Sequence, residues 1–202
     1  MRLPVALVVV TLVAGCTGSQ AGTPHAEPTS QPSSAQASTT TQPARRPRSL
    51  DLNGVDPCKL LTEQQLAVFA VDRPVHPAVP QNGVLAGSPG CTAGSFEQQH
   101  GFLIIASTQM GLSEFLSKVR ANPSRKNITV DDFPAVEEEG ATSAPERGSG
   151  ECYVNVDVAD GQFLEVQFSQ IAASQEKRLP IETVCAKAKE VAEAALTTLQ
   201  GG

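Results

Sequence analysis

The sequence from residue 51 to residue 202 predicts an α+β domain, in which an antiparallel sheet packs against N- and C-terminal helices and two disulfides brace the fold. Apolar residues alternate with polar ones over 152–158 and 164–168, on either side of an Asp160-Gly161 pair typical of a two-residue hairpin turn. Over 184–199, apolar residues instead recur at helical spacing and form one stripe. The domain contains four cysteines, and this even number indicates the two bridges.

The first helix of the domain is expected to begin after Thr62 and to continue to about Ala70. Thr62 followed by Gln65 matches a capping box, in which each side chain accepts a hydrogen bond from the other residue's backbone N–H. Residues 72–90 are rich in proline and glycine and predict an irregular loop.

Further strands and a second helix are expected after this loop. The strands expected outside the hairpin cover 91–96, 102–108, 126–130 and 135–139. A second amphipathic helix is expected over 112–121, and Asn122-Pro123 ends it.

The first sixteen residues form an apolar segment that ends in Val13-Ala14-Gly15-Cys16. The apolar run from Leu3 to Val13 is too short to span a hydrocarbon core of about 30 Å. The segment resembles the signal peptide and lipobox of a bacterial lipoprotein, which implies cleavage after residue 15 and lipid on Cys16. Residues 1–15 are therefore interpreted as a signal peptide, and the mature chain is expected at the outer face of the cell membrane. An ordinary secretory signal with a coincidental cysteine is the alternative.

Residues 16–50 are interpreted as the lipidated cysteine and a disordered tether, because Ser, Thr, Pro, Gln and Ala dominate them. Residues 1–50 carry a net charge of +3, whereas residues 51–202 carry 11 basic and 20 acidic side chains, a net charge of −9. An acidic domain lacks the clustered cations that phosphate contacts need, so no nucleic-acid partner is expected.

The four cysteines of the domain are Cys58, Cys91, Cys152 and Cys185, and they allow three disulfide pairings. The nested pairing is favoured, with Cys91–Cys152 inside Cys58–Cys185, because it joins two strand starts and ties the segment before the first helix to the last helix. A redox or metal site is the alternative, but the chain has no Cys-x-x-Cys pair and no Cys/His cluster at zinc spacing.

The inventory of catalytic side chains is poor, and no catalytic residue, metal or cofactor is predicted. His76 and His100 are the histidines of the domain, and no Gly-x-Ser-x-Gly motif accompanies them. The densest acidic sites are Asp131-Asp132 and Glu137-Glu138-Glu139, where a solvated acidic surface is favoured over a calcium site or paired catalytic carboxylates.

Several motifs together resemble one family. They are Asp56-Pro57-Cys58 with Leu60-Leu61-Thr62, Pro89-Gly90-Cys91, Cys152 at the head of the alternating strand, and Cys185 three residues before Ala188. This order resembles the actinobacterial lipoproteins catalogued as domain of unknown function 3558, over about residues 50–199. The resemblance implies lipid anchoring and export, and it implies no activity. Members often have an aromatic residue where this chain has Ala93.

The favoured functional hypothesis is a non-enzymatic envelope lipoprotein that binds a small apolar ligand, a glycolipid or another envelope protein. The residues expected to line a groove between sheet and helices are Phe96, Phe102, Phe115 and Phe133. Two alternatives remain, namely a hydrolase acting on cell-wall polymer or lipid ester through His100 or the Asp131/Asp132 pair, and an extracellular sensing module.

Overall fold

The structure, a computed structural model, describes residues 45–140, 149–171 and 178–201. It contains a seven-stranded antiparallel sheet in the order β1-β2-β3-β7-β6-β5-β4. The strands are β1 (His76–Ala78), β2 (Gly90–Ser95), β3 (His100–Ser107), β4 (Lys126–Val130), β5 (Phe133–Glu139), β6 (Ser149–Ala159) and β7 (Gln162–Ile171). The helices are the 3-10 helix η1 (Pro57–Lys59), α1 (Glu63–Val68), α2 (Leu112–Lys118) and α3 (Ile181–Leu199). The expected antiparallel sheet, C-terminal helix and two disulfides are confirmed.

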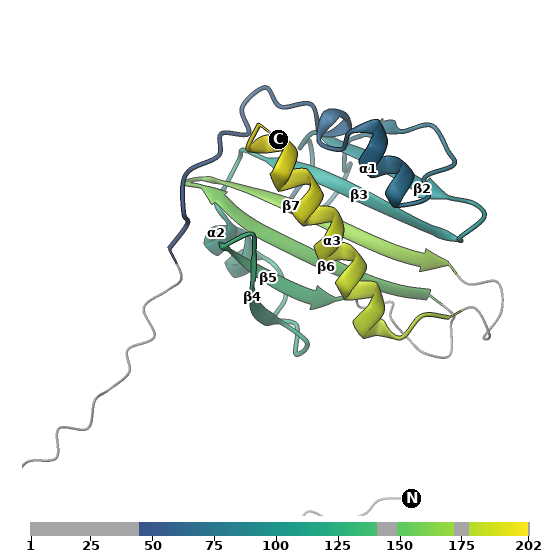
Figure 1. The fold of residues 1–202 in the computed structure, drawn as a ribbon. Helices are drawn as coiled ribbons and strands as arrows, with labels where there is room; N and C mark the ends of the chain where they lie inside the picture. Colours follow the sequence, from purple (N-terminus) through teal and green to yellow (C-terminus); the bar gives the residue numbers. More distant parts are fainter. Residues whose placement is uncertain (1–44, 141–148, 172–177, 202) are drawn as a thin grey trace, which may run out of the picture. The chain divides into compact units, whose positions relative to one another are not determined.

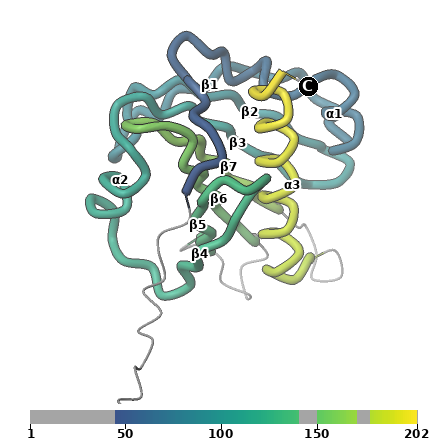
Figure 2. The backbone as a smooth tube through the Cα atoms, turned by 60° about the vertical axis from the view of Figure 1, so that its left-hand side comes forward, coloured from purple at the N-terminus to yellow at the C-terminus, as the bar shows by residue number. Residues whose placement is uncertain are grey.

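The sheet separates two helical layers. Helix α3 crosses one side of the sheet (Figure 1), and the turned view places α2 on the opposite side (Figure 2). We call these sides the α3 face and the α2 face. Successive strand residues alternate between them, so Phe102 and Ile104 of β3 lie on the α3 face and Leu103 and Ile105 on the α2 face.

The main core lies on the α3 face. The stripe of α3 predicted from helical spacing is buried there, with Leu199 partly buried at its end. The stripe meets alternate residues of β3, β5, β6 and β7, among them the fully buried Phe133. Helix α1 adjoins α3, where Gln65 Nε2 donates to the carbonyl oxygen of Ala194 at 3.0 Å.

A second, smaller core lies on the α2 face. Leu112 and Phe115 of α2 pack on Ile105, Val136 and Phe163 of the sheet, and the rings of Phe115 and Phe163 are 4.8 Å apart. This helix covers part of the face, and the rest of the face carries the site described below.

Local signals in the sequence predicted several elements well. The capping box is present, since the Thr62 hydroxyl accepts from Gln65 N and the Gln65 side chain accepts from Thr62 N. Gly161 turns the β6–β7 hairpin at φ 72°. Asp131 and Asp132, at φ 46° and 67°, form the tight turn between β4 and β5. The predicted loop over 72–90, however, contains the short edge strand β1.

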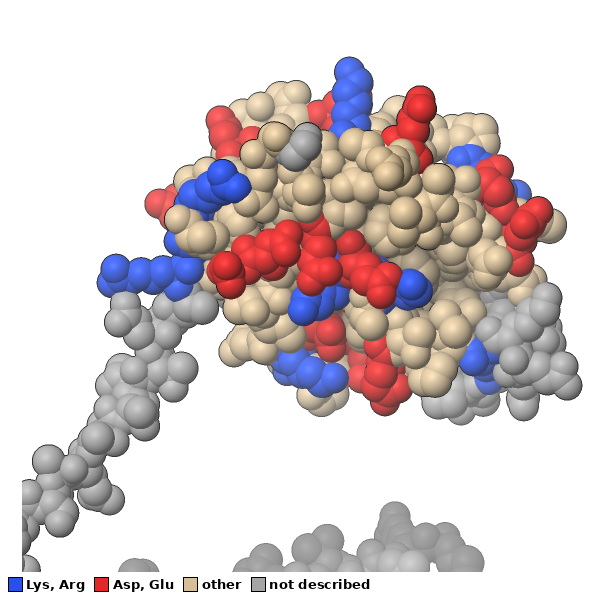
Figure 3. All heavy atoms as spheres, in the orientation of Figure 1, with Lys and Arg blue, Asp and Glu red and all other residues tan. Residues whose placement is uncertain are grey.

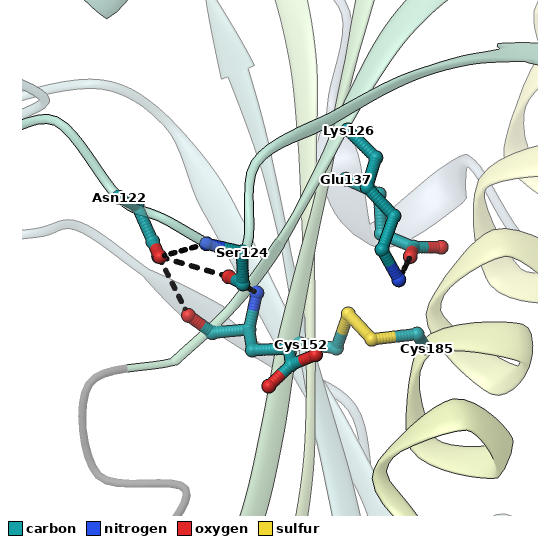
Figure 4. Close-up of a disulfide and its surroundings, with 7 residues drawn as sticks. Asn122, Ser124, Lys126, Glu137, Cys152 and Cys185 are labelled. Carbon is teal, nitrogen blue, oxygen red and sulfur yellow. Dashed lines mark hydrogen bonds and ion pairs between the residues drawn. A yellow bond between two sulfur atoms is a disulfide. The ribbon is translucent and has the colours of Figure 1, made fainter.

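The disulfide pairing differs from the nested one. Cys58 bonds to Cys91 and Cys152 bonds to Cys185, so each cysteine pairs with its neighbour in sequence. Figure 4 shows the second bridge, between β6 and α3. Strands β3 and β7 lie between β2 and β6, which places Cys91 and Cys152 at least about 14 Å apart, too far for a bridge. The nested prediction was therefore wrong, because it took two strand starts to be adjacent.

Ordered contacts begin before residue 51. Leu50 N donates to the Val158 carbonyl at 2.9 Å, and Arg46 pairs with Asp157 at 2.6 Å and with Asp160. Residues 45–50 thus pack on the domain and are not part of a free tether.

Cys16, the signal peptide and most of the tether lie outside the described residues. No helix in the described part of the chain is long and apolar enough to cross a membrane.

Candidate functional site

A groove opens on the α2 face where α2 does not cover the sheet. Its cavity volume is about 850 Å³, and strands β1, β2, β3 and β7 contribute to it. The floor is formed by Thr92, Gly94, Gly101, Leu103, Gln167 and Ser169. A second cavity of about 400 Å³ lies elsewhere, beside Gly54 and Thr108.

The floor is hollow because one row across the sheet has almost no side chains. Gly94, Gly101 and Ser169 are direct partners across β2, β3 and β7. A Cβ on Gly94 would lie 2.6 Å from the His100 carbonyl oxygen, so only glycine fits there. A Cβ on Gly101 would meet only the Ala93 carbonyl oxygen, at 3.5 Å, which is an ordinary contact. A side chain at 101 would therefore fit the fold and fill the groove.

One wall of the groove is an exposed aromatic side chain with a guanidinium over it. Phe96 is 73% exposed at the end of β2, and the Arg73 guanidinium carbon lies 5.4 Å from its ring centroid. This distance is within the range of a cation–π contact. Both residues, with His76 of β1, line the groove.

Asp72 holds this wall in place. Its Oδ1 accepts from Phe96 N at 2.8 Å, and its Oδ2 accepts from Glu97 N at 2.9 Å and from the Ser95 hydroxyl at 2.8 Å. The two backbone hydrogen bonds, followed by the Ser95 bond and the charge of Arg73, hold the pKa of Asp72 below its usual range. The loop that carries Arg73 is therefore tied to the β2–β3 turn.

Beyond Ser169, the same row of the sheet reaches Glu151 on β6. Glu151 Oε1 accepts from Gln167 Nε2 and from the Ser169 hydroxyl, at 3.3 Å for the second bond. Gly140 makes room for this carboxylate, because a Cβ at 140 would come within 2.5 Å of Glu151 Oε2. Burial, and then the charge of Glu151, raise the pKa of Tyr153 above its usual value.

Glu165 faces the same side of the sheet as Glu151 and is only 6% exposed. Burial raises its pKa to about 7, and the charges of Glu138 and Glu151 add to the effect. None of the described residues donates a hydrogen bond to its carboxyl group, and Oδ1 of Asn155, its partner on β6, has no hydrogen bond either. Arg125 donates from Nε to Glu138, while its Nη2 is buried without a partner.

The four phenylalanines expected to line a groove lie in different places. Phe96 lines the groove and is exposed. Phe102 borders it, but its side chain is buried in the main core, edge-on to Phe69 at 6.0 Å. Phe115 and Phe133 are core residues of the two separate clusters and are not groove residues.

The residues named for a hydrolase are not brought together. The His100 ring stacks on Phe168 at 5.2 Å, and its Nε2 lies 3.0 Å from the Phe69 carbonyl oxygen. Burial lowers the pKa of His100. Asp131 and Asp132 occupy the β4–β5 turn, and three strands separate β3 from β4, a distance of about 19 Å across the sheet.

The run Glu137-Glu138-Glu139 alternates between the two faces of β5. Glu137 lies beside the Cys152–Cys185 bridge and pairs with Lys126 at 3.5 Å (Figure 4). The two sulfur atoms are bonded to each other, so they offer no thiolate to a metal ion.

No pattern in the sequence marks the floor of the groove or Glu165 as part of a site. The expected strand covered 102–108, whereas β3 begins at His100 and includes Gly101. The alternating pattern did place Glu165 and Gln167 away from the main core. The alternating pattern did not indicate that a second helical layer covers the α2 face.

The chain matches a protein-family model over most of its length. The family model described as "Protein of unknown function (DUF3558)" matches residues 11–198, and the chain is a member of that family. No curated protein matches the chain.

Proposed function

We propose that this chain is a lipid-anchored protein of the cell envelope that binds a small apolar or amphiphilic ligand, such as a glycolipid, in the groove of the α2 face. The observation that carries the proposal is the bare glycine row beneath a cavity of about 850 Å³. This volume is within the range of small-molecule sites, which are concave and mostly apolar with a few polar groups. Leu103 and Phe96 supply apolar surface, and Thr92 and Gln167 supply polar atoms.

The anchor is the second part of the proposal. The Val13-Ala14-Gly15-Cys16 segment supports acylation of Cys16. Each buried methylene contributes about 0.8 kcal/mol, so two or more acyl chains hold a protein stably at a membrane. A groove in an anchored domain has access to ligands that are too apolar to diffuse freely in water.

The substitution Gly101→Val tests the binding site. We expect valine to fit the strand and to fill the floor, which should reduce ligand retention about tenfold, equivalent to about 1.4 kcal/mol. The measurement is native mass spectrometry after incubation with an envelope lipid extract. The Cys16→Ser form should be used throughout, because it can be purified without detergent that would compete for the groove.

The matched control is Thr129→Val, which places the same side chain at an exposed position of edge strand β4, outside the groove. This variant should retain as much ligand as the parent protein. Equal retention by the Gly101→Val form would contradict the proposed site. A parent protein that retains no lipid, but cross-links to an envelope protein through Phe96, would show that the groove is a protein-binding surface.

A further inference from the structure

We infer that the ligand of the groove carries an anionic head group, a carboxylate or a phosphate, which binds to Arg73. The inference rests on the proposed binding function and specifies the chemistry of the ligand. It follows from the charges around the groove, the way in which Arg73 is held, and the position of Arg73 relative to the apolar floor.

The groove differs in charge from the rest of the domain. Residues 51–202 contain 20 acidic and 11 basic side chains, and acidic side chains are spread over the face that carries α3 (Figure 3). None of the described residues that line the groove is acidic, whereas Arg73 and two histidines are among them. The ring of His100 stacks on Phe168 of the main core, and burial lowers its pKa. Arg73 is therefore the permanent charge of the groove lining, and its sign is opposite to that of the domain.

Arg73 is positioned in advance of binding. Its guanidinium lies over the Phe96 ring, and Asp72, the preceding residue, is fixed by three hydrogen bonds to the β2–β3 turn. The N–H groups of a guanidinium lie in one plane, where they can bind a carboxylate or phosphate with two hydrogen bonds, and contact with a ring restricts the side chain. Less side-chain entropy is then lost when an anion binds.

No described carboxylate forms an ion pair with Arg73. The adjacent Asp72 directs its oxygens to the backbone N–H groups of Phe96 and Glu97 and to the Ser95 hydroxyl, and it interacts with Arg73 only through its charge. The guanidinium edge is thus available to a ligand. The net negative charge of the domain opposes an anion only weakly, since charges more than about 8 Å apart are screened at physiological salt.

The floor of the groove indicates the second feature of the ligand, an apolar part. From Phe96 and Arg73 the cavity continues over the Gly94–Gly101 row and beside Leu103, which is partly buried against the second core. An alkyl or other apolar part lying on this row leaves its polar end at Arg73. The groove therefore fits an anionic amphiphile better than a neutral or cationic one.

Probes with matched chains test this inference on the Cys16→Ser form. Dodecanoate, dodecyl phosphate, dodecanol and dodecylamine share one alkyl chain, and inorganic phosphate has none. Isothermal titration calorimetry below the micelle concentration should show that the two anionic amphiphiles bind about tenfold more tightly than the alcohol, with the amine weakest. The ratio of dodecanoate to dodecyl phosphate affinity distinguishes a carboxylate head group from a phosphate one.

The variant Arg73→Gln should lose the preference for anions and bind dodecanoate about as weakly as dodecanol. Its control is Arg120→Gln, which removes the same charge from an exposed position that does not line the groove. If all four amphiphiles bind the parent protein equally and Gly101→Val blocks their binding, the head-group inference is wrong, but the groove is still the binding site. If no amphiphile binds and the lipid extract is not retained, the proposed function itself fails. Tight binding of phosphate alone, unaffected by Gly101→Val, would contradict an amphiphilic ligand.

Discussion

Removal of the Cys152–Cys185 bridge by C152A/C185A should lower the free energy of unfolding by at least about 4 kcal/mol. The bridge joins residues 33 positions apart, and a loop of that length accounts for about 4 kcal/mol in the chain-entropy model. Cys152 and Cys185 are also buried in the main core between β6 and α3. Their loss leaves unfilled space there, which adds to the cost. Chemical denaturation followed by circular dichroism gives the value.

The other disulfide is a matched control. Cys58–Cys91 has the same sequence separation of 33, so its loop-entropy contribution is the same. Cys58, however, is only half-buried. The variant C58A/C91A should therefore be about 1 kcal/mol less destabilised than C152A/C185A. An equal or larger loss of stability for C58A/C91A would show that core packing of the Cys152–Cys185 bridge does not distinguish the two bridges.

The variant Glu165→Gln should remove a loss of stability that the parent protein shows between about pH 4.5 and pH 7. Burial, with the charges of Glu138 and Glu151, raises the pKa of Glu165 to about 7 in the folded protein, against 4.5 in the unfolded chain. The folded state therefore holds this proton more tightly, and stability falls as pH rises through this interval. The shift corresponds to about 3 kcal/mol in total. Urea denaturation at a series of pH values measures it.

The parent protein and the Glu165→Gln variant share the other titrating groups, so the difference between their pH profiles reports Glu165. The lowered pKa values of Asp51 and Asp72 change the free energy of unfolding at acidic pH, below the pH interval in which Glu165 titrates. The lowered pKa of His100 acts in the opposite direction, because the folded state holds that proton less tightly. Glu114→Gln, at an exposed position of α2, is the control for the loss of one carboxylate. A Glu165→Gln profile parallel to that of the parent would contradict a buried, protonated Glu165.

Elements whose signals lie within a few adjacent residues were predictable from the sequence. The Thr62–Gln65 capping box and the Asp160-Gly161 turn each depend on a short segment, and both are present. Strand β1 had no such signal. It has three residues, one of them Pro77, and it exists because it pairs with β2 at the edge of the sheet.

Features that depend on the order of the strands were not predictable. The disulfide pairing follows from the packing of α3 on β6 and of η1 near β2, which local periodicity does not encode. The groove floor likewise depends on the register that aligns Gly94, Gly101 and Ser169. Each of these residues looks ordinary in the sequence, and together they form a row only when β3 lies between β2 and β7.

Backbone amide shifts can show whether the glycine row of the α2 face is a binding site. In a ¹H–¹⁵N titration of the Cys16→Ser form with dodecanoate, the amides of Gly94, Gly101 and Ser169 should shift together and saturate. Gly54 and Thr108, beside the second cavity, should not move. Saturable shifts at Gly54 and Thr108 with none along the glycine row would contradict the account.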